Sequence, residues 1–146
     1  GLTAPLKLRA DTEQTTPHDT YRLTGGEPDW HLQVKLGEDW RTLYVFTLEE
    51  RQAADYLAAN TYVSTDPHSK FTRELGVALS PSGRRLTLAG NRLTIRTQGE
   101  PNAVQVLDSV EALHEALSGP FGIGLPPAEL LDPVLQRIIE QAPKPE

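Results

Sequence analysis

The amino-acid sequence predicts an α+β fold, with a β-rich half, a linking helix and loop, and an antiparallel meander closed by helices. Three observations support this prediction. Apolar residues alternate at Leu32, Val34 and Leu36, which is the period of a half-buried strand. At Thr47 the period changes to one typical of a helix, and the alternation returns after Phe71.

Residues 1–46 are predicted to be β-rich. Turn residues from Thr24 to Pro28 separate Leu23 from the alternating strand, as in a hairpin. A second apolar run, from Trp40 to Phe46, is rich in the aromatic and β-branched residues that strands favour. We therefore expect antiparallel strands here.

A helix is predicted from Thr47, because Thr47 and Glu50 have the spacing of a capping box. It should end near Asn60. The stretch 60–69 is polar and contains a proline, so it is predicted to be a structured loop.

Three short strands are predicted after residue 71, and a fourth is suggested at residues 104–106. Their apolar positions alternate at Leu75, Val77, Leu79, Leu86, Leu88, Leu93, Ile95, Val104 and Val106. Asp108 and Glu111 form a second capping-box pattern, which opens a helix that ends at Gly119. A last amphipathic helix is predicted to begin at Pro133, behind Asp132.

Composition excludes several classes of function. The chain has 146 residues, a formal net charge of −6 and no clustered basic face, so we expect no nucleic-acid partner. It has no cysteine, which rules out disulfides, thiolate–metal sites and thiol catalysis on these residues. There is no signal-peptide pattern and no apolar stretch near the roughly 20 residues of a membrane helix, so we expect a cytoplasmic protein with no membrane partner. The first residue is Gly1 and the chain has no methionine, so we expect a trimmed chain or a fragment.

No catalytic or metal site follows from the histidines alone. They are His18, His31, His68 and His114, and none has the spacing of a metal-ligand pair. His31 and His114 are expected to face solvent. His18 lies beside Asp19 and near two threonines, but neighbours on an extended chain point to opposite faces and cannot form a relay. Trp30 and Trp40 could form a ligand platform, although core packing is favoured.

The segment 60–71 combines amide, hydroxyl and cationic side chains between the two halves. Hydroxyls and backbone amides in a proline-containing loop suit an anionic or amide-rich ligand, and Lys70 and His68 suit phosphates. The alternative is a loop whose Ser and Thr side chains satisfy its own backbone.

The same segment resembles a known protein family. Its pattern is Asn60-x-Tyr62-x-Ser64-Thr65-x-Pro67-x-Ser69-x-Phe71. Further matches, in chain order, are Leu2-Thr3-Ala4-Pro5-Leu6, Pro17-His18-x-x-Tyr21-Arg22-Leu23, Trp40-Arg41-x-Leu43-Tyr44-x-Phe46-x-Leu48, Gly83-Arg84-Arg85, Gly90-Asn91-Arg92-Leu93 and Phe121-Gly122-Ile123-x-Leu125-Pro126. In order and spacing these resemble the arylamine N-acetyltransferases, from residue 2 to about residue 126.

The resemblance implies a domain organisation. The family has a helical bundle, a β-barrel and an α/β lid. This chain would cover later strands of the barrel, as an antiparallel β-barrel remnant, then the interdomain helix and loop, the α/β lid domain and a C-terminal helical extension. The corresponding ranges are 1–46, 47–70, 71–126 and 127–146. The docking of the extension is left open.

The resemblance also implies a function. The family transfers an acetyl group from acetyl-CoA, its co-substrate, to an arylamine or arylhydrazine through a Cys–His–Asp triad, with no metal. All three triad residues would precede Gly1, so this chain would form part of the CoA and substrate cleft and carry no catalytic residue. The family's CoA-contacting positions match Thr65, His68, Ser69 and Lys70. Its acceptor pocket matches Leu2 and Thr3.

Departures and alternatives remain. Thr61 stands where many bacterial members carry Trp. The chain could instead be a non-catalytic binding or interaction module, or a subunit that completes an active site in trans. Because half a barrel leaves strand edges unpaired, we also expect self-association through those edges.

Overall fold

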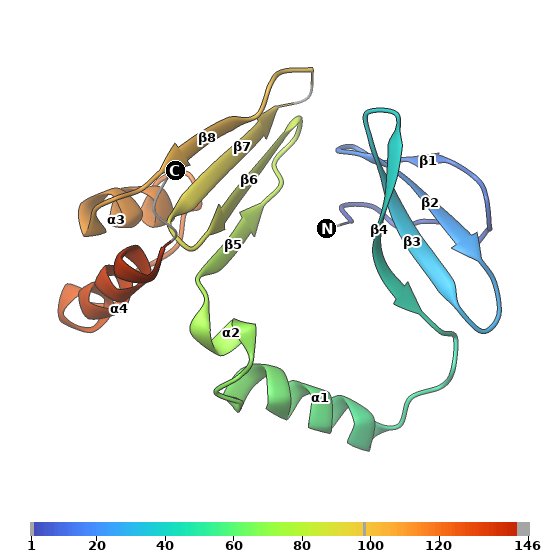
Figure 1. Cartoon of the computed structure of the whole chain (residues 1–146), viewed down its shortest axis with the longest axis horizontal. Coiled ribbons are helices and arrows are strands. Elements are labelled where there is room, and N and C mark those ends of the chain that lie inside the picture. Colours follow the sequence, from blue (N-terminus) through green and yellow to red (C-terminus); the bar gives the residue numbers. More distant parts are fainter. Residues whose placement is uncertain (1, 98, 143–146) are drawn as a thin grey trace. The chain divides into compact units, whose positions relative to one another are not determined.

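The computed structural model of this chain describes residues 2–97 and 99–142. It contains two antiparallel sheets, and along the chain two helices follow the first sheet and two follow the second (Figure 1). The chain divides into two compact units, Gly1–Ala53 and Ala54–Glu146. Each unit contains its own four-stranded sheet, and the helices follow the first sheet. The predicted α+β class is confirmed.

The first unit is a sheet of four strands in the order β1-β2-β3-β4. The strands are β1 Gln14–Thr15, β2 Thr20–Gly25, β3 Trp30–Leu36 and β4 Asp39–Phe46. Each pairs antiparallel with the next along the chain, and a register shift interrupts the pairing of β3 with β4 at Leu32/Gln33. This is the order expected for strands that are joined by short turns.

Pairs of buried residues on β2 and β3 form the core of the first unit. Tyr21 lies opposite Val34, and Leu23 lies opposite Leu32, and all four side chains are buried. The predicted alternation at Leu32 and Val34 is therefore confirmed, because residues two apart on a strand share one face. Leu36, at the end of β3, is exposed.

The second unit contains a sheet in the order β5-β6-β7-β8, with helices before and after it. Its strands are β5 Gly76–Leu79, β6 Arg84–Ala89, β7 Arg92–Thr97 and β8 Ala103–Val106. Its helices are α1 Ala53–Thr65, α2 Lys70–Arg73, α3 Val110–Ser118 and α4 Ala128–Gln141. The predicted antiparallel meander is confirmed with four strands.

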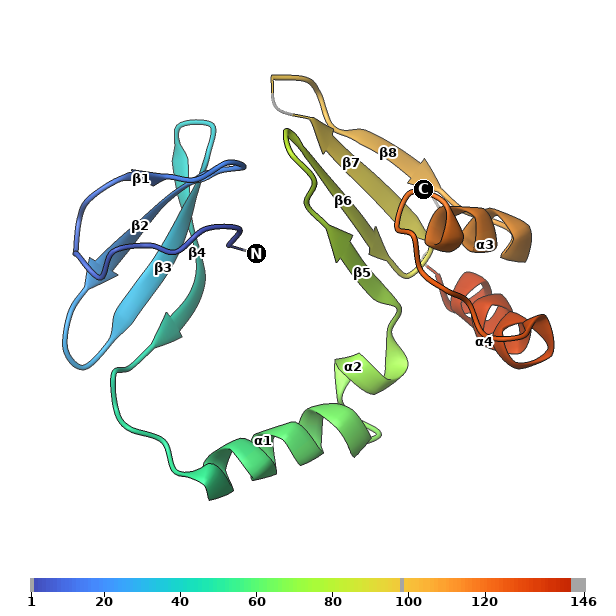
Figure 2. The ribbon, with the colours of Figure 1, turned by 180° about the vertical axis from the view of Figure 1, so that it is seen from behind.

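Helices α3 and α4 lie beside the second sheet and share its core (Figures 1 and 2). Leu88 on β6, Leu113 on α3 and Leu135 on α4 are each at most 1% exposed and belong to one apolar cluster. Burial of side chains of this size stabilises the fold by roughly 1.5–3 kcal/mol each. Residues 127–142, whose docking the sequence left open, therefore contribute to this core.

Helix α1 begins at Ala53, so the predicted start at Thr47 is wrong. Residues 47–52 are not helical, and there Arg51 Nη2 lies 3.0 Å from the Glu49 carboxylate and donates to the Thr47 hydroxyl at 3.5 Å. The Thr47 hydroxyl thus bonds a side chain, and it caps no helix in the structure. The predicted end near Asn60 is also wrong, since α1 continues to Thr65.

The starts of the last two helices also differ from the prediction. Ser109, rather than Asp108, is the N-cap of α3, and its side chain accepts a hydrogen bond from Ala112 N at 3.1 Å. Helix α4 begins at Ala128, after Pro127, so Pro133 lies inside the helix and is not its first residue. Pro133 has no N–H to donate to the preceding turn, and the helix nevertheless continues to Gln141.

Candidate functional site

The candidate cofactor-binding segment is the junction of α1 and α2. The side chain of Ser69 is at the centre of this junction and is 1% exposed. Its hydroxyl donates to the Val63 carbonyl at 3.1 Å and accepts from Phe71 N at 3.3 Å, as the N-cap of α2. Ser69 thereby ties the last turns of α1 to the start of α2.

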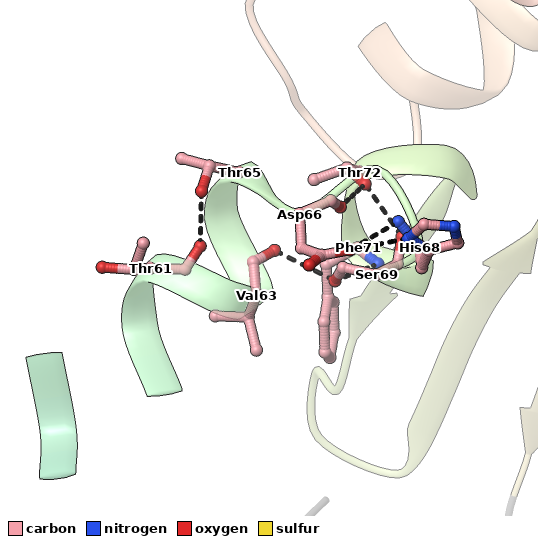
Figure 3. A network of polar contacts seen from close by, with 8 residues as sticks. All are labelled: Thr61, Val63, Thr65, Asp66, His68, Ser69, Phe71 and Thr72. Carbon is pink, nitrogen blue, oxygen red and sulfur yellow. Dashed lines mark hydrogen bonds and ion pairs between the residues drawn. The ribbon is translucent and has the colours of Figure 1, made fainter. Parts of the chain in front are cut away.

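Asp66 organises the turn between the two helices (Figure 3). Its carboxylate accepts a hydrogen bond from His68 N at 2.7 Å, and its carbonyl accepts from Ser69 N at 3.0 Å and from the Thr72 hydroxyl at 2.8 Å. Aspartate commonly bonds the backbone two residues ahead in this way. The spacing of Asp66 and His68 is the signal by which the sequence could have revealed this role, and neither Asp66 nor Thr72 is among the predicted site residues.

The polar residues just before Asp66 are helical, and two of their side chains bond carbonyls within α1. Ser64 Oγ donates to Asn60 O at 2.6 Å, and Thr65 Oγ1 donates to Thr61 O at 2.7 Å. Back-bonding to the carbonyl four residues earlier lets Ser and Thr occupy a helix. The hydroxyl proton of Thr65 is engaged in this bond, and its oxygen can still accept.

His68 and Lys70 supply an imidazole and an ammonium group at the junction, and both residues are exposed. The His68 side chain is 86% exposed, and its Nδ1 atom lies 3.2 Å from the Asp66 carboxylate. Lys70 Nζ lies 5.2 Å from the centre of the Phe71 ring, and in the described part of the chain it forms no ion pair. The junction can therefore present an ammonium group and an imidazole N–H to an anion, on a turn held in shape by bonds within residues 66–72.

The two predicted acceptor-pocket residues belong to the first unit. Leu2 is 40% exposed, and Thr3 Oγ1 lies 2.8 Å from His18 Nδ1. His18 thus has a partner, Thr3, that its sequence neighbours do not predict. Thr65, His68, Ser69 and Lys70 belong to the second unit.

The remaining histidine and tryptophan predictions have mixed outcomes. His114 does not face solvent freely, because its Nε2 atom lies 2.7 Å from Asp132 Oδ1 and its side chain is 28% exposed. This contact joins α3 to α4. Trp30 packs against the core of the first unit, as expected. Trp40 is half-buried, and the Arg22 Cζ atom lies 4.1 Å from the centre of its ring.

Within residues 2–97 and 99–142, no helix is long and apolar enough to cross a membrane. Over the same residues, no three His, Asp or Glu side chains lie close enough together to hold a metal ion.

Comparisons with known proteins point to one family. A family model described as N-acetyltransferase matches residues 1–130. The curated arylamine N-acetyltransferase of Escherichia coli (strain K12) is 35% identical over 129 residues, which make up 88% of this chain and 46% of that protein.

Solved structures agree with this match. The arylamine N-acetyltransferase from M. tuberculosis has a TM-score of 0.85 and 31% identity, over 92% of this chain and 51% of its own. The Mycobacterium marinum arylamine N-acetyltransferase in complex with CoA has a TM-score of 0.86 and 29% identity, over 93% of this chain and 51% of its own. The chain spans about half the length of these relatives.

Proposed function

The chain belongs to the arylamine N-acetyltransferase family, and from this we propose that it forms the CoA-binding part of an acetyl-CoA-dependent acetyltransferase. The acceptor would be an arylamine or arylhydrazine. The observation that supports the proposal most directly is the exposure of Lys70 and His68 on the α1–α2 junction, which the sequence resemblance assigns to the family's CoA-contacting segment.

The four proposed CoA-binding residues would act in different ways. Lys70 and His68 would meet the phosphates, since an ammonium or imidazolium forms charge-assisted bonds to phosphate oxygens. Thr65 would accept a hydrogen bond through its free lone pairs. Ser69 would act mainly by holding the turn, because its hydroxyl already bonds Val63 and Phe71. Leu2 and Thr3 remain proposed acceptor-pocket residues.

These 146 residues contain no cysteine, so the acetyl-carrying thiol would have to be supplied from outside them. We propose that the chain contributes binding and orientation, and that a Cys–His–Asp triad is contributed by other residues. Incubation with acetyl-CoA should accordingly leave the intact mass of this chain unchanged. The expected cytoplasmic location is part of the same proposal.

Calorimetric titration with CoA tests the binding proposal. Lys70→Gln removes one exposed cation and should weaken CoA binding about ten-fold, the loss expected for a charged hydrogen bond to phosphate. Lys7→Gln is the matched control, because Lys7 is also exposed but lies in the first unit. The proposal fails if CoA does not bind, or if the two variants bind CoA equally.

A second candidate is supported by exposed apolar residues on β4. Leu43, Tyr44 and Val45 are 44%, 51% and 50% exposed, and β4 is an edge strand of the first sheet. An uncovered apolar edge strand favours pairing with another chain. An interaction module that associates with a second copy through β4 would account for this surface without any catalysis.

A further inference from the structure

A cleft of about 870 Å³ lies within the second unit. Neither Thr65 nor Ser69 lines it. It is formed by α2 and the residues after it, the turn between β6 and β7, the end of β8 and the last turn of α4. Its volume falls in the range of about 300–1,000 Å³ that is usual for small-molecule sites.

The charged residues of the cleft are predominantly positive. Lys70, Arg73 and Arg92 line it together with one carboxylate, Glu74. Three positive charges and one negative charge give the lining a formal charge of +2, in a chain whose net charge is −6. Among the residues that the structure describes, none of these four side chains forms an ion pair. Within the described part of the chain, their charges are therefore not paired in ion pairs.

Apolar side chains form the rest of the cleft. Leu75 and Ile138 line it and also pack against the core of the second unit, so this part of the wall is anchored. Phe71 lines it as well and is 69% exposed, with Lys70 Nζ 5.2 Å from its ring centre. An exposed aromatic ring beside a cation can hold the flat apolar body of a ligand whose charged group meets the cation.

We propose that this cleft binds a phosphate monoester attached to an apolar or aromatic group. A phosphate monoester carries a charge of about −1.5 to −2 at pH 7, which matches the formal charge of the lining. Arginine side chains suit it because the guanidinium fork bonds two phosphate oxygens at once. Phe71, Leu75 and Ile138 receive the apolar body.

Two sources could supply this chemistry. One is a free aryl or alkyl phosphate, and the other is the 3′-phosphate of CoA, whose involvement rests on the proposed function. Competition separates them, because dephospho-CoA lacks that phosphate. Lys70 is common to the cleft and to the proposed CoA contacts, so the variants below use Arg73 and Arg92, which only the cleft requires.

Fluorescence titration of the protein with 1-naphthyl phosphate tests the site. Arg92→Gln and Arg73→Gln should each weaken binding about ten-fold, as expected when one charged hydrogen bond is lost. Arg84→Gln is the matched control, because Arg84 is an exposed arginine at the other end of β6 and outside the cleft. It should leave binding unchanged, and 1-naphthol should bind much more weakly than its phosphate.

Three results would overturn the proposal: no binding of 1-naphthyl phosphate, equal binding of 1-naphthol, or equal affinity in the Arg73, Arg92 and Arg84 variants. Circular dichroism of each variant shows that it is folded. When the probe binds as expected, displacement by CoA but not by dephospho-CoA supports the site with CoA as the source. Displacement by neither supports it with a separate phosphorylated ligand, even if the CoA-binding proposal fails.

Discussion

Replacing Ser69 by alanine should destabilise the second unit, although it removes only one oxygen atom. The hydroxyl is almost fully buried and makes two bonds, to Val63 O and from Phe71 N. Loss of an N-cap costs about 1 kcal/mol. Loss of the donor to the Val63 carbonyl costs about 1 kcal/mol more. Ser69→Ala should therefore lower the free energy of unfolding of the second unit by about 2 kcal/mol.

Urea unfolding followed by two optical signals measures this change. Both tryptophans, Trp30 and Trp40, lie in the first unit, so their fluorescence reports on that unit. Circular dichroism at the helical band reports on α1 to α4. The midpoint of the dichroism transition should fall by roughly 1 M urea, given typical dependences on denaturant. The fluorescence midpoint should stay where it is.

Ser64→Ala is the matched control. Ser64 is in the same segment, but it is exposed and its hydroxyl bonds only the carbonyls of its own helix. Alanine is the better helix former, so Ser64→Ala should be neutral or slightly stabilising. If the two variants shift the dichroism midpoint equally, the Ser69 hydroxyl does not hold the junction. A Ser69→Ala variant of unchanged stability that no longer binds CoA would show instead that Ser69 contacts the ligand.

Three further predictions concern the rest of the chain. Leu135→Ala should lower the free energy of unfolding by about 2–5 kcal/mol, because Leu135 is buried where α4 packs on the core. Leu130 is 70% exposed on the same helix, so Leu130→Ala should change this free energy little, and thermal unfolding compares the two variants. The contact between His114 and Asp132 is partly exposed, so a double-mutant cycle with alanine at both positions should give a coupling energy of about 1 kcal/mol or less. A value near zero would mean that this contact does not stabilise the packing of α4 on α3. Val45→Lys on β4 should shift the protein toward the monomer in light scattering at high concentration; a wild-type protein that is already monomeric there would argue against association through β4.

The strands could be predicted from the sequence because their signal is local. Leu32 and Val34, and Leu86 and Leu88, alternate with more polar residues and are buried as expected. The same period that places side chains on one face is visible in the sequence itself. The helix boundaries were less predictable, because Thr47 and Glu50 have the spacing of a capping box and yet α1 begins only at Ala53.

The candidate site was predictable only in part. The composition of residues 60–71 drew attention to the α1–α2 junction, but Ser and Thr there favoured a loop on propensity alone. In the structure Ser64 and Thr65 are nevertheless helical, with their hydroxyls bonded to carbonyls in α1. The cleft could not be predicted at all, since Arg73 and Arg92 belong to elements that only the pairing of β5, β6 and β7 brings together.

The exposure of helix α1 affects how the binding of a partner to it can be measured. Its 13 residues include no buried side chain in the part of the chain that the structure describes, and Tyr56, Leu57 and Tyr62 are 66%, 68% and 52% exposed. A helix of this length is only marginally stable in water without packing. Binding of a partner to α1 is therefore coupled to formation of the helix. Any partner that covers α1 therefore spends part of its binding energy on ordering the helix, and amide hydrogen exchange in α1 should slow in step with occupancy. The turn at Asp66 is joined to α1 by the bonds from Asp66 N to Tyr62 O and from the Ser69 hydroxyl to Val63 O, so these two bonds depend on the same equilibrium.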